Sequence, residues 1–333
     1  MDKRIKARFN QAILREAMQR FGIGEESVHE LGGFESFIYE FSCGSESHIL
    51  RIGHGSRRSE NLVHGEVDWI NYLAREGVSV ARAAESARGK LVESLDDGHG
   101  GQFLATAFVK AQGEPPWQAG WSPELYRTYG RLIGRMHRLT KDYLPPCLAW
   151  KRPEWDDAEI QDIEANLPSD QALVIDRYWE VRSHLGSLVK GRDDYGLIHF
   201  DAHGSNMLVD SEGRITLFDF DDCSYGWFAY DIAIVLFYMI TNRPDATSVC
   251  DEFMPRFLEG YRVENRLDSA WLREIPWFLK LREIDLYAVI HRSFDVDRLT
   301  DSWVSRFMQG RRGRIEQAVP YVEYDFPTLA AYL

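Results

Sequence analysis

The chain has 333 residues, 44% of them hydrophobic and 13% aromatic, so it can build a large core, which we expect to be split between two lobes. A formal net charge of −13 without any basic block predicts no nucleic-acid partner, because phosphate binding needs clustered Lys and Arg. The longest hydrophobic stretch, Ile232 to Ile240, is far shorter than the ~20 residues of a membrane span, and the four cysteines have no paired spacing. We therefore expect a cytoplasmic protein with no membrane partner, and the oligomeric state stays open.

The first third of the chain predicts an antiparallel sheet with one main helix packed on it. Residues 8–22 carry apolar side chains at helical spacing, and β-like runs at 38–41 and 48–52 flank a predicted turn at 44–46. A helix is expected over 61–75, and two more strands near 90–93 and 102–108.

Two features of this region are candidates for a binding site. Glu66 lies at the edge of the apolar face of the 61–75 helix and needs a partner, for which Arg51 at the end of the preceding strand is the candidate. Gly32 and Gly33 stand before a strand, where backbone amides can approach phosphate oxygens. By themselves two adjacent glycines favour a simple turn, and they indicate a phosphate loop only if the rest of a nucleotide site is present.

The stretch from Gln112 to Trp117 interrupts the regular pattern and predicts a domain boundary, which gives lobes of residues 1–112 and 113–333. A helix is expected to begin at Ser122-Pro123, since Ser caps helices and Pro fits a first turn. Another helix is expected over 170–190, and the chain is almost wholly helical from Asp231 onward. The predicted fold class is therefore α+β.

The most informative motif lies between these helices. His199-Phe200-Asp201-Ala202-His203-Gly204-Ser205-Asn206 is followed thirteen residues after Asn206 by Asp219, in an acidic run that includes Asp221. Short strands at 207–209 and 215–218, joined by a turn at 210–213, predict a hairpin that returns Asp219 toward Asp201 and Asn206. Two carboxylates and an amide suit phosphoryl transfer, in which one carboxylate accepts a hydroxyl proton while the other oxygens hold magnesium.

Other interpretations of the same residues are weaker. Asp201-Ala202-His203 resembles part of the Asp-Ala-His-x-Asp signature of ureohydrolases, but Ser205 stands where the second Asp belongs. His199, Asp201 and His203 in alternation would suit a transition metal, but no Cys or Glu lies near in sequence to complete the ligand set. In the simplest alternative, Asp201 and Asn206 only form a loop and Asp219 only closes a turn. Turn chemistry does not require an Asp inside a strand between Phe218 and Phe220, where it is costly to bury without a cationic partner.

From about residue 25 to 290 the chain resembles the aminoglycoside phosphotransferase and choline kinase-like superfamily, near homoserine kinase type II and the bacterial stress-response kinases. The resemblance implies a protein-kinase-like bilobal fold, with an antiparallel N-terminal lobe that binds nucleotide and a mostly helical C-terminal lobe. It also implies ATP or GTP with Mg2+ as cofactors, and a small molecule that accepts phosphate on a hydroxyl group. By the same resemblance, Asp201 is the catalytic base, Asn206 the magnesium-binding amide, and Asp219 the metal-bridging carboxylate, assisted by Asp221.

The resemblance also implies roles for residues outside the motif. Glu66 orients the phosphate-binding cation, which is Arg51 here where protein kinases have Lys, and Arg presents a planar fork instead of a point charge. The nucleotide loop includes Gly32, Gly33 and Ser36, and the adenine hinge falls at Thr106–Lys110, including Thr106 and Phe108. Asp231 is implied to cap the next helix and to brace the catalytic loop. Phe200 stands where the family usually has Gly.

The acceptor is the least determined part. By position, six residues of the C-terminal helices are expected to line its pocket: Trp277, Arg282, Glu283, Asp285, Tyr287 and Asp297. Their acidic content suits an amine-bearing alcohol such as an aminoglycoside, homoserine or choline, although solvated helix faces explain it equally well. His137 and His291 are interpreted as packing residues. A protein Ser/Thr kinase of the stress-response type and a nucleotide-binding pseudokinase scaffold are the competing functions.

Overall fold

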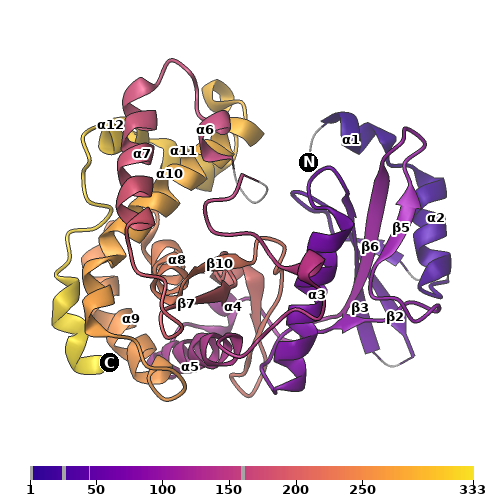
Figure 1. The fold of residues 1–333 in the computed structure, drawn as a ribbon, viewed down its shortest axis with the longest axis horizontal. Coiled ribbons are helices and arrows are strands. Elements are labelled where there is room, and N and C mark those ends of the chain that lie inside the picture. The colour runs from indigo at the N-terminus through magenta and orange to yellow at the C-terminus, as the bar shows by residue number, and fades with distance from the viewer. Residues whose placement is uncertain (1–2, 25–27, 45, 159–161) are drawn as a thin grey trace. The chain divides into compact units, whose positions relative to one another are not determined.

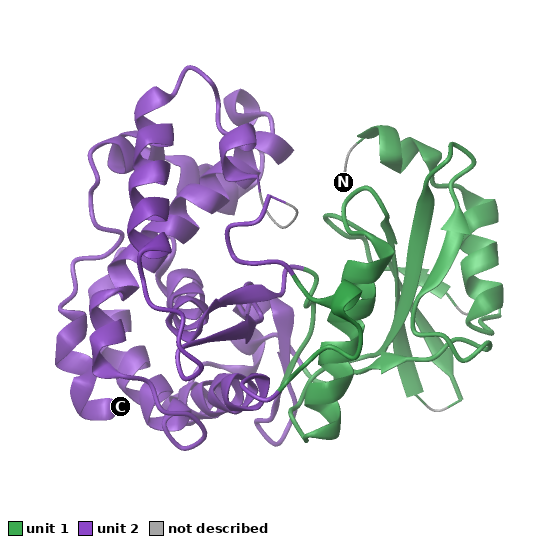
Figure 2. Cartoon of the chain, viewed as in Figure 1, with its two compact units in different colours: residues 1–113, 143–152, 216–221 green, residues 114–142, 153–215, 222–333 purple. Residues whose placement is uncertain are grey.

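The computed structural model describes residues 3–24, 28–44, 46–158 and 162–333, and the chain divides into two compact units (Figure 2). Unit 1 comprises residues 1–113, 143–152 and 216–221, and unit 2 comprises residues 114–142, 153–215 and 222–333. The assignment of 1–112 and 113–333 to two functional lobes stays a prediction.

Unit 1 is built on an antiparallel sheet in the order β1-β2-β3-β6-β4, with β5 also pairing with β6 (Figure 1). Its helices are α1 (Lys3–Arg8), α2 (Gln11–Arg20), α3 (Glu60–Arg75) and the 3-10 turn η1 (Leu148–Trp150). Its strands are β1 (Val28–Glu30), β2 (Phe37–Cys43), β3 (Glu46–His54), β4 (Ala83–Ala84), β5 (Glu93–Asp96) and β6 (Gln102–Val109).

The two faces of this sheet carry different helices, and Figure 1 shows α2 and α3 on opposite sides of it. Leu50 and Ile52 of β3, with Ala105 of β6, belong to a core that they share with α2. Arg51 lies between Leu50 and Ile52, so its side chain points to the other face, where it meets Glu66 of α3. Because successive side chains of a strand alternate between faces, the register that buries the apolar residues also turns Arg51 toward α3.

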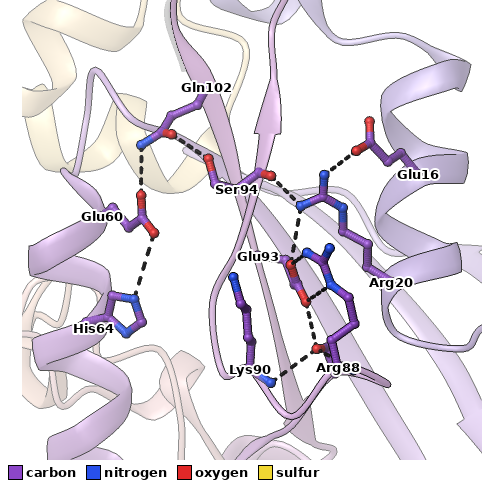
Figure 3. Close-up of polar contacts among 10 residues, drawn as sticks. Glu16, Arg20, Glu60, His64, Arg88, Lys90, Glu93, Ser94 and Gln102 are labelled. Carbon is purple, nitrogen blue, oxygen red and sulfur yellow. Dashed lines mark hydrogen bonds and ion pairs between the residues drawn. The ribbon is translucent and has the colours of Figure 1, made fainter.

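A buried carboxylate joins α2 to the sheet (Figure 3). Glu93 is fully buried in β5 and accepts hydrogen bonds from Arg20 Nη1 of α2 (3.2 Å), Ser86 Oγ (2.7 Å) and Arg88 Nε (3.0 Å). Burial by itself raises the pKa of Glu93, but the hydrogen bonds from Arg88 and Ser86 outweigh it and lower the pKa to about 2. The ionised carboxylate therefore stabilises the folded state.

We expect Glu93→Gln to lower the free energy of unfolding by about 1–3 kcal/mol, because the neutral amide cannot satisfy both guanidinium groups. The folded-state pKa lies below the ordinary value, so the contribution of Glu93 is complete above about pH 4.5 and is lost as the pH falls toward 2. Urea unfolding of wild type and variant at pH 7 and pH 3 measures both effects. An equal gap between the two proteins at both pH values would contradict the assignment.

Unit 2 is mostly helical, with β7 (Tyr195–Ile198) paired to β10 (Ser224–Trp227). A second two-stranded sheet joins β8 (Met207–Val209) to β9 (Ile215–Leu217), and the division between the units falls within β9. The α-helices are α4 (Pro116–Ala119), α5 (Pro123–Thr140), α6 (Ile163–Asn166), α7 (Ala172–Gly186), α8 (Phe228–Ile240), α9 (Ala246–Tyr261), α10 (Ile275–Ser293), α11 (Ser302–Met308) and α12 (Arg311–Glu316). The 3-10 segments are η2 (Gly204–Asn206), η3 (Ser269–Arg273), η4 (Val296–Arg298) and η5 (Phe326–Tyr332).

Glycines let α5 and α9 pack at close range. A Cβ on Gly130 would lie 1.8 Å from the carbonyl oxygen of Phe257, and one on Gly260 would lie 2.0 Å from that of Arg127. No side chain fits at either position, so the two backbones meet directly. This contact fixes α5, whose Ser122 accepts a hydrogen bond from the amide of Leu125 as the sequence predicts.

Most predicted elements are confirmed, and their bounds shift. The predicted helix over 8–22 is α2, which begins after the capping residue Asn10. The strand expected at 90–93 begins only at Glu93, because the preceding residues form the turn that positions Ser86 and Arg88. The turn predicted at 44–46 includes Ser45, which lies outside the described residues. Among the described helices, none combines the length and the apolar character that a membrane span requires.

Candidate active site

The loop after β7 is held by a buried carboxylate. Asp231 accepts hydrogen bonds from the backbone amides of His199 (3.1 Å) and Phe200 (2.9 Å), and its Oδ2 lies 3.0 Å from Nε2 of His137. The predicted bracing of the catalytic loop is thus confirmed. The predicted helix cap is wrong, because α8 begins at Phe228 after Trp227 and Asp231 lies inside its first turn. Burial lowers the pKa of His137, consistent with the predicted packing role.

Phe200 shows why Gly is usual at its position. Its φ is +70°, a left-handed conformation that costs a residue with a side chain about 1–2 kcal/mol. The ring is buried and meets Tyr230 edge to face at 5.1 Å, while the amide is bonded to Asp231. Packing and hydrogen bonding therefore hold a backbone turn that Gly would adopt without strain.

Asp201 follows this turn and is held through both carboxylate oxygens. Arg282 Nη2 of α10 donates to Oδ1, while Asn206 Nδ2 donates to Oδ2 at 3.1 Å and His203 Nε2 lies 3.3 Å from Oδ2. Burial by itself raises the pKa of Asp201, but the charges of His203 and Arg282 hold it well below its usual range. The carboxylate is therefore ionised and oriented at neutral pH, as a proton acceptor must be.

Asn206 has an orientation that suits a metal ligand. Its Nδ2 donates to the backbone oxygen of Asp201 at 3.0 Å as well as to Oδ2, so Oδ1 is the atom that can coordinate a cation. In unit 1, Asp219 follows the end of β9 with φ +62°. The expectation that Asp219 lies inside a strand is wrong, because the strand ends at Leu217 and Asp219 lies beyond it in a left-handed backbone conformation.

The predicted pairing of Arg51 with Glu66 is confirmed as a two-point ion pair. Both guanidinium Nη atoms donate to the two oxygens of Glu66 at 2.7 Å. Burial by itself lowers the pKa of Arg51, but Glu66, Asp221 and Asp219 raise it above its ordinary value, so the guanidinium stays charged. Arg51 also lies 5.0 Å from the centre of the Phe108 ring. The planar guanidinium of Arg51 thus makes a two-point contact with Glu66 that the single ammonium group of a Lys could not make.

We expect Glu66→Ala to lower the free energy of unfolding by about 3–5 kcal/mol, because it leaves the buried guanidinium of Arg51 without its partner. Glu60→Ala, in the exposed first turn of the same helix, is the control and should cost no more than about 1 kcal/mol. Urea unfolding monitored by circular dichroism measures both. Equal losses for the two variants would contradict the assignment.

Asp221 lies among arginines that the sequence did not single out. Its carboxylate pairs with Arg57 Nη2 and lies 3.8 Å from Arg58 Nε, while Arg152 Nη2 donates to its backbone oxygen at 2.7 Å. The cationic partners hold the pKa of Asp221 well below its usual range in spite of burial, which opposes them. Its predicted role in magnesium binding stays a prediction, and the observed partners favour an anchor for the arginines.

The segment predicted to be the nucleotide loop forms a tight turn. Its binding of phosphate stays a prediction. A Cβ on Gly33 would lie 2.1 Å from the carbonyl oxygen of Ser36, so Gly is required there, and Gly32 has φ +73°. Ser36, Arg51, Arg57 and Arg58 line one small cavity of about 20 Å³. The turn that precedes β2, Arg51 of β3 and the two arginines that follow β3 are thus brought together within unit 1.

The residues predicted for the adenine hinge lie within the sheet. Thr106 pairs with Arg51 of β3, and Phe108 pairs with Ile49 on one side and Ala83 on the other. The amides of Val109 and Lys110 donate to Arg82 and Ser47. The sheet therefore uses much of the backbone that we expected to bind the base, and nucleotide contact by Thr106 and Phe108 stays a prediction.

A cavity of about 610 Å³ adjoins the catalytic loop in unit 2. His203, Gly204 and Ser205 of the loop form one wall of this space, which we call the acceptor cavity after the role proposed for it below. The remaining lining is Trp117, Trp121, Tyr126, Tyr129, Val235, Tyr238, Met239, Thr241, Arg243, Val249, Glu252 and Trp303. Six aromatic side chains and one carboxylate thus surround a space whose wall includes His203, which lies two residues after Asp201 in the chain. The sequence analysis missed this cavity, and the two tryptophans at 117 and 121, at the end of the predicted boundary and just after it, are a signal that could have located it.

The prediction of six residues for the acceptor pocket is wrong for this cavity, although two of the six lie close to Asp201. Arg282 contacts Asp201 and, at 2.7 Å, Asp285, so these two lie at the catalytic loop. Three of the others contact residues away from the loop: Glu283 binds Lys280 and Arg311, Tyr287 donates a hydrogen bond to Gln171, and Trp277 stacks on His184. The last, Asp297, lies in η4. None of the six lines the acceptor cavity. The prediction of an almost wholly helical chain from Asp231 onward includes α10 but does not say which face of α10 turns inward.

The described part of the chain contains no group of three or more His, Cys, Asp or Glu side chains placed to hold a metal ion. His199, Asp201 and His203, considered above as a transition-metal site, do not form such a group. His203 instead contacts Asp201 and packs against Tyr238 with ring centroids 4.3 Å apart.

The fold and the motif together define a phosphotransferase with the protein-kinase-like architecture, as the sequence predicts. The chain belongs to the phosphotransferase enzyme family, whose model matches residues 30–275. It is 38% identical over 332 residues to amicoumacin kinase of Bacillus subtilis (strain 168), covering 98% of each chain. The predicted superfamily and the predicted phosphotransferase activity are confirmed.

Solved structures agree with this assignment. A structure of amicoumacin kinase in complex with AMP-PNP, Ca2+ and Ami matches with a TM-score of 0.93 and 39% identity, covering 99% of this chain and 100% of that chain. A spectinomycin phosphotransferase with ADP and spectinomycin matches with a TM-score of 0.61 and 16% identity, covering 97% and 98%. A choline kinase of Streptococcus pneumoniae matches at 0.60 and 12%, covering 92% and 99%. These last two share the fold, which confirms the predicted α+β class.

Proposed function

We propose that this protein transfers the γ-phosphate of magnesium-bound ATP to a hydroxyl group of amicoumacin or of a closely related small molecule. The observation that carries this proposal is the acceptor cavity, because its wall includes His203, Gly204 and Ser205 of the loop that bears Asp201. The 38% identity to amicoumacin kinase, over nearly the whole of both chains, supports the choice of acceptor. The AMP-PNP and Ca2+ bound by a relative support ATP and a divalent cation as cofactors.

In this mechanism Asp201 orients the acceptor hydroxyl and receives its proton. The hydroxyl oxygen forms a bond to the γ-phosphorus, the bond from that phosphorus to the bridging oxygen breaks, and the bridging oxygen leaves with the electron pair as part of ADP. Asn206 Oδ1 and Asp219 would hold the magnesium ion, which neutralises charge on the phosphates when bound. Arg51, kept charged and aimed by Glu66, binds phosphate oxygens.

The composition of the cavity indicates the kind of acceptor. Its aromatic walls favour a ligand with a flat apolar part, since Trp and Tyr faces stack on such groups. Glu252 is the carboxylate of the lining and interacts with Tyr126, whereas Arg243 is paired with Asp245. The carboxylate suits an amine on the acceptor. The sequence-based expectation of an amine-bearing alcohol is therefore kept, with a different set of residues.

The first test is phosphate transfer from magnesium-ATP and magnesium-GTP to amicoumacin, aminoglycosides, spectinomycin, homoserine, choline and a generic protein substrate. We expect amicoumacin to be phosphorylated and Asp201→Asn to lower kcat by about 10²- to 10⁴-fold while ATP still binds. Asp210→Asn, in the exposed turn of the β8–β9 hairpin, is the matched control and should keep wild-type kcat. Transfer to protein alone would move the assignment to a protein kinase, and unchanged kcat in Asp201→Asn would remove Asp201 from the mechanism.

A second test addresses the acceptor cavity. Glu252→Gln should raise KM for an amine-bearing acceptor by about tenfold, because one charge-assisted hydrogen bond at an exposed site is lost, and should leave KM for ATP unchanged. Glu259→Gln on the same helix, where Glu259 pairs with Arg127 and Arg256 outside the cavity, is the control. Steady-state kinetics of both variants decide the matter. An equal KM for the acceptor in the two variants would exclude Glu252 from recognition.

A further inference from the structure

Arg282 of α10 is a buried cation that contacts the catalytic carboxylate. Its Nη2 donates to Asp201 Oδ1 and, at 2.7 Å, to the hydroxyl of Tyr238, while Nη1 donates to Asp285 Oδ2 at 2.7 Å. Arg282 and Asp285 are 7% and 1% exposed. They are three residues apart on one helix, so α10 itself delivers the ion pair to the loop.

This group is costly for the fold. Asp285 Oδ1, Arg282 Nε and the hydroxyl of Tyr230 are buried without a hydrogen-bond partner among the described residues. Burial, together with Asp222 and Asp201, raises the pKa of Asp285 to about 7 against the opposing effect of Arg282. Apolar side chains of similar volume would pack here at no such cost. A buried and incompletely satisfied charge network beside the catalytic base indicates a role in the reaction.

The two oxygens of the Asp201 carboxylate have different partners. Oδ1 is engaged by Arg282 from α10, whereas Oδ2 faces Asn206 and His203. His203 also lines the acceptor cavity, so Oδ2 is the oxygen on the side of the acceptor. Arg282 thereby determines which oxygen of the carboxylate is presented to the hydroxyl.

Tyr238 connects this arrangement to the cavity. Its ring lines the acceptor cavity and packs against His203, its hydroxyl accepts from Arg282, and the guanidinium carbon lies 5.3 Å from the centre of its ring. One guanidinium thus contacts the catalytic carboxylate and a wall of the acceptor cavity at once. A ligand that moves Tyr238 would act on the orientation of Asp201 through Arg282.

We propose that Arg282, aimed by Asp285, is a positioning residue that orients the carboxylate of Asp201 toward the acceptor and ties it to Tyr238. The inference rests on the proposed function, since it assigns a role in the same reaction. Misplacement of a reacting group by about 1 Å costs about 10² in rate, which is the size of effect that loss of this contact should have.

The experiment measures kcat, KM for ATP and KM for the acceptor in Arg282→Met, Arg282→Lys and Asp285→Asn. Arg282→Met should lower kcat about 10²-fold with KM for ATP unchanged, and the other two variants should fall between it and wild type. Lys keeps the charge but cannot bridge Asp201, Asp285 and Tyr238 together. Arg311→Met, which breaks a buried pair with Glu283 on the same α10 away from the loop, is the matched control and should lose stability but keep kcat.

A double-variant cycle with Asp201→Asn separates positioning from general stability. If Arg282 acts through Asp201, adding Arg282→Met to Asp201→Asn should lower kcat no further. Multiplicative losses in the double variant, or wild-type kcat in Arg282→Met, would overturn the proposal. If the Met variant does not fold, Arg282→Lys in the same cycle gives the answer.

Acceptor-independent hydrolysis of ATP, measured in all variants, keeps the two proposals distinct. Loss of this hydrolysis in Arg282→Met, together with failure of every acceptor in the panel, would support the positioning role and reject the proposed acceptor. Acceptor phosphorylation that is unaffected by Arg282→Met would support the proposed acceptor and reject the positioning role of Arg282.

Discussion

The catalytic loop depends on one buried carboxylate, that of Asp231. It accepts hydrogen bonds from the backbone amides of two consecutive residues, His199 and Phe200, and its Oδ2 lies 3.0 Å from Nε2 of His137 in α5. A carboxylate that accepts several hydrogen bonds is satisfied in a site without water, and the amides it binds cannot rotate away. The left-handed turn at Phe200 is held by this contact, and the position of Asp201 follows from it.

Each unit, taken by itself, also contains a group of buried or half-buried charged side chains. In unit 1, Arg51, Arg57, Arg58 and Arg152 surround Asp221, and Arg51 is fixed by Glu66. In unit 2, Arg282 lies between Asp201 and Asp285. Buried ion pairs contribute little net stability compared with apolar packing, so their concentration at residues of the phosphotransferase motif is best understood as serving the reaction.

The family fold and the acceptor preference have different structural origins. The motif residues come from the loop after β7 and from the hairpin that follows, and the overall fold is shared with a solved structure of only 12% identity. The proposed acceptor cavity shares one wall with that loop, and the rest of its lining comes mainly from α4, α5, α8, α9 and α11, with Trp and Tyr at its surface. Specificity can therefore change through these helices while Asp231 and the loop it braces stay as they are.

The helices and strands, the phosphotransferase motif and the ion pair of Arg51 with Glu66 could all be predicted from the spacing of residues along the chain. Helical and alternating periodicity predicted α3, α5 and β6, the Ser122 cap was read from local chemistry, and the Arg51–Glu66 pair followed from the isolation of one carboxylate on an apolar face. These features are visible because they depend on residues close in the chain or on a side chain that must be compensated wherever it is buried.

The partners of the motif residues, and the cavity proposed for the acceptor, follow from how distant segments pack and could not be predicted from residue spacing. Arg282 and Asp201 are 81 positions apart, and Arg57 and Asp221 are 164 apart. Periodicity predicts that α10 has an inward face, but the packing of α10 against α8 decides that Arg282 reaches the loop while Glu283, one residue on, binds Arg311. A contact between distant segments depends on how helices pack and on the direction each side chain takes, and neither is contained in the spacing of residues along one element.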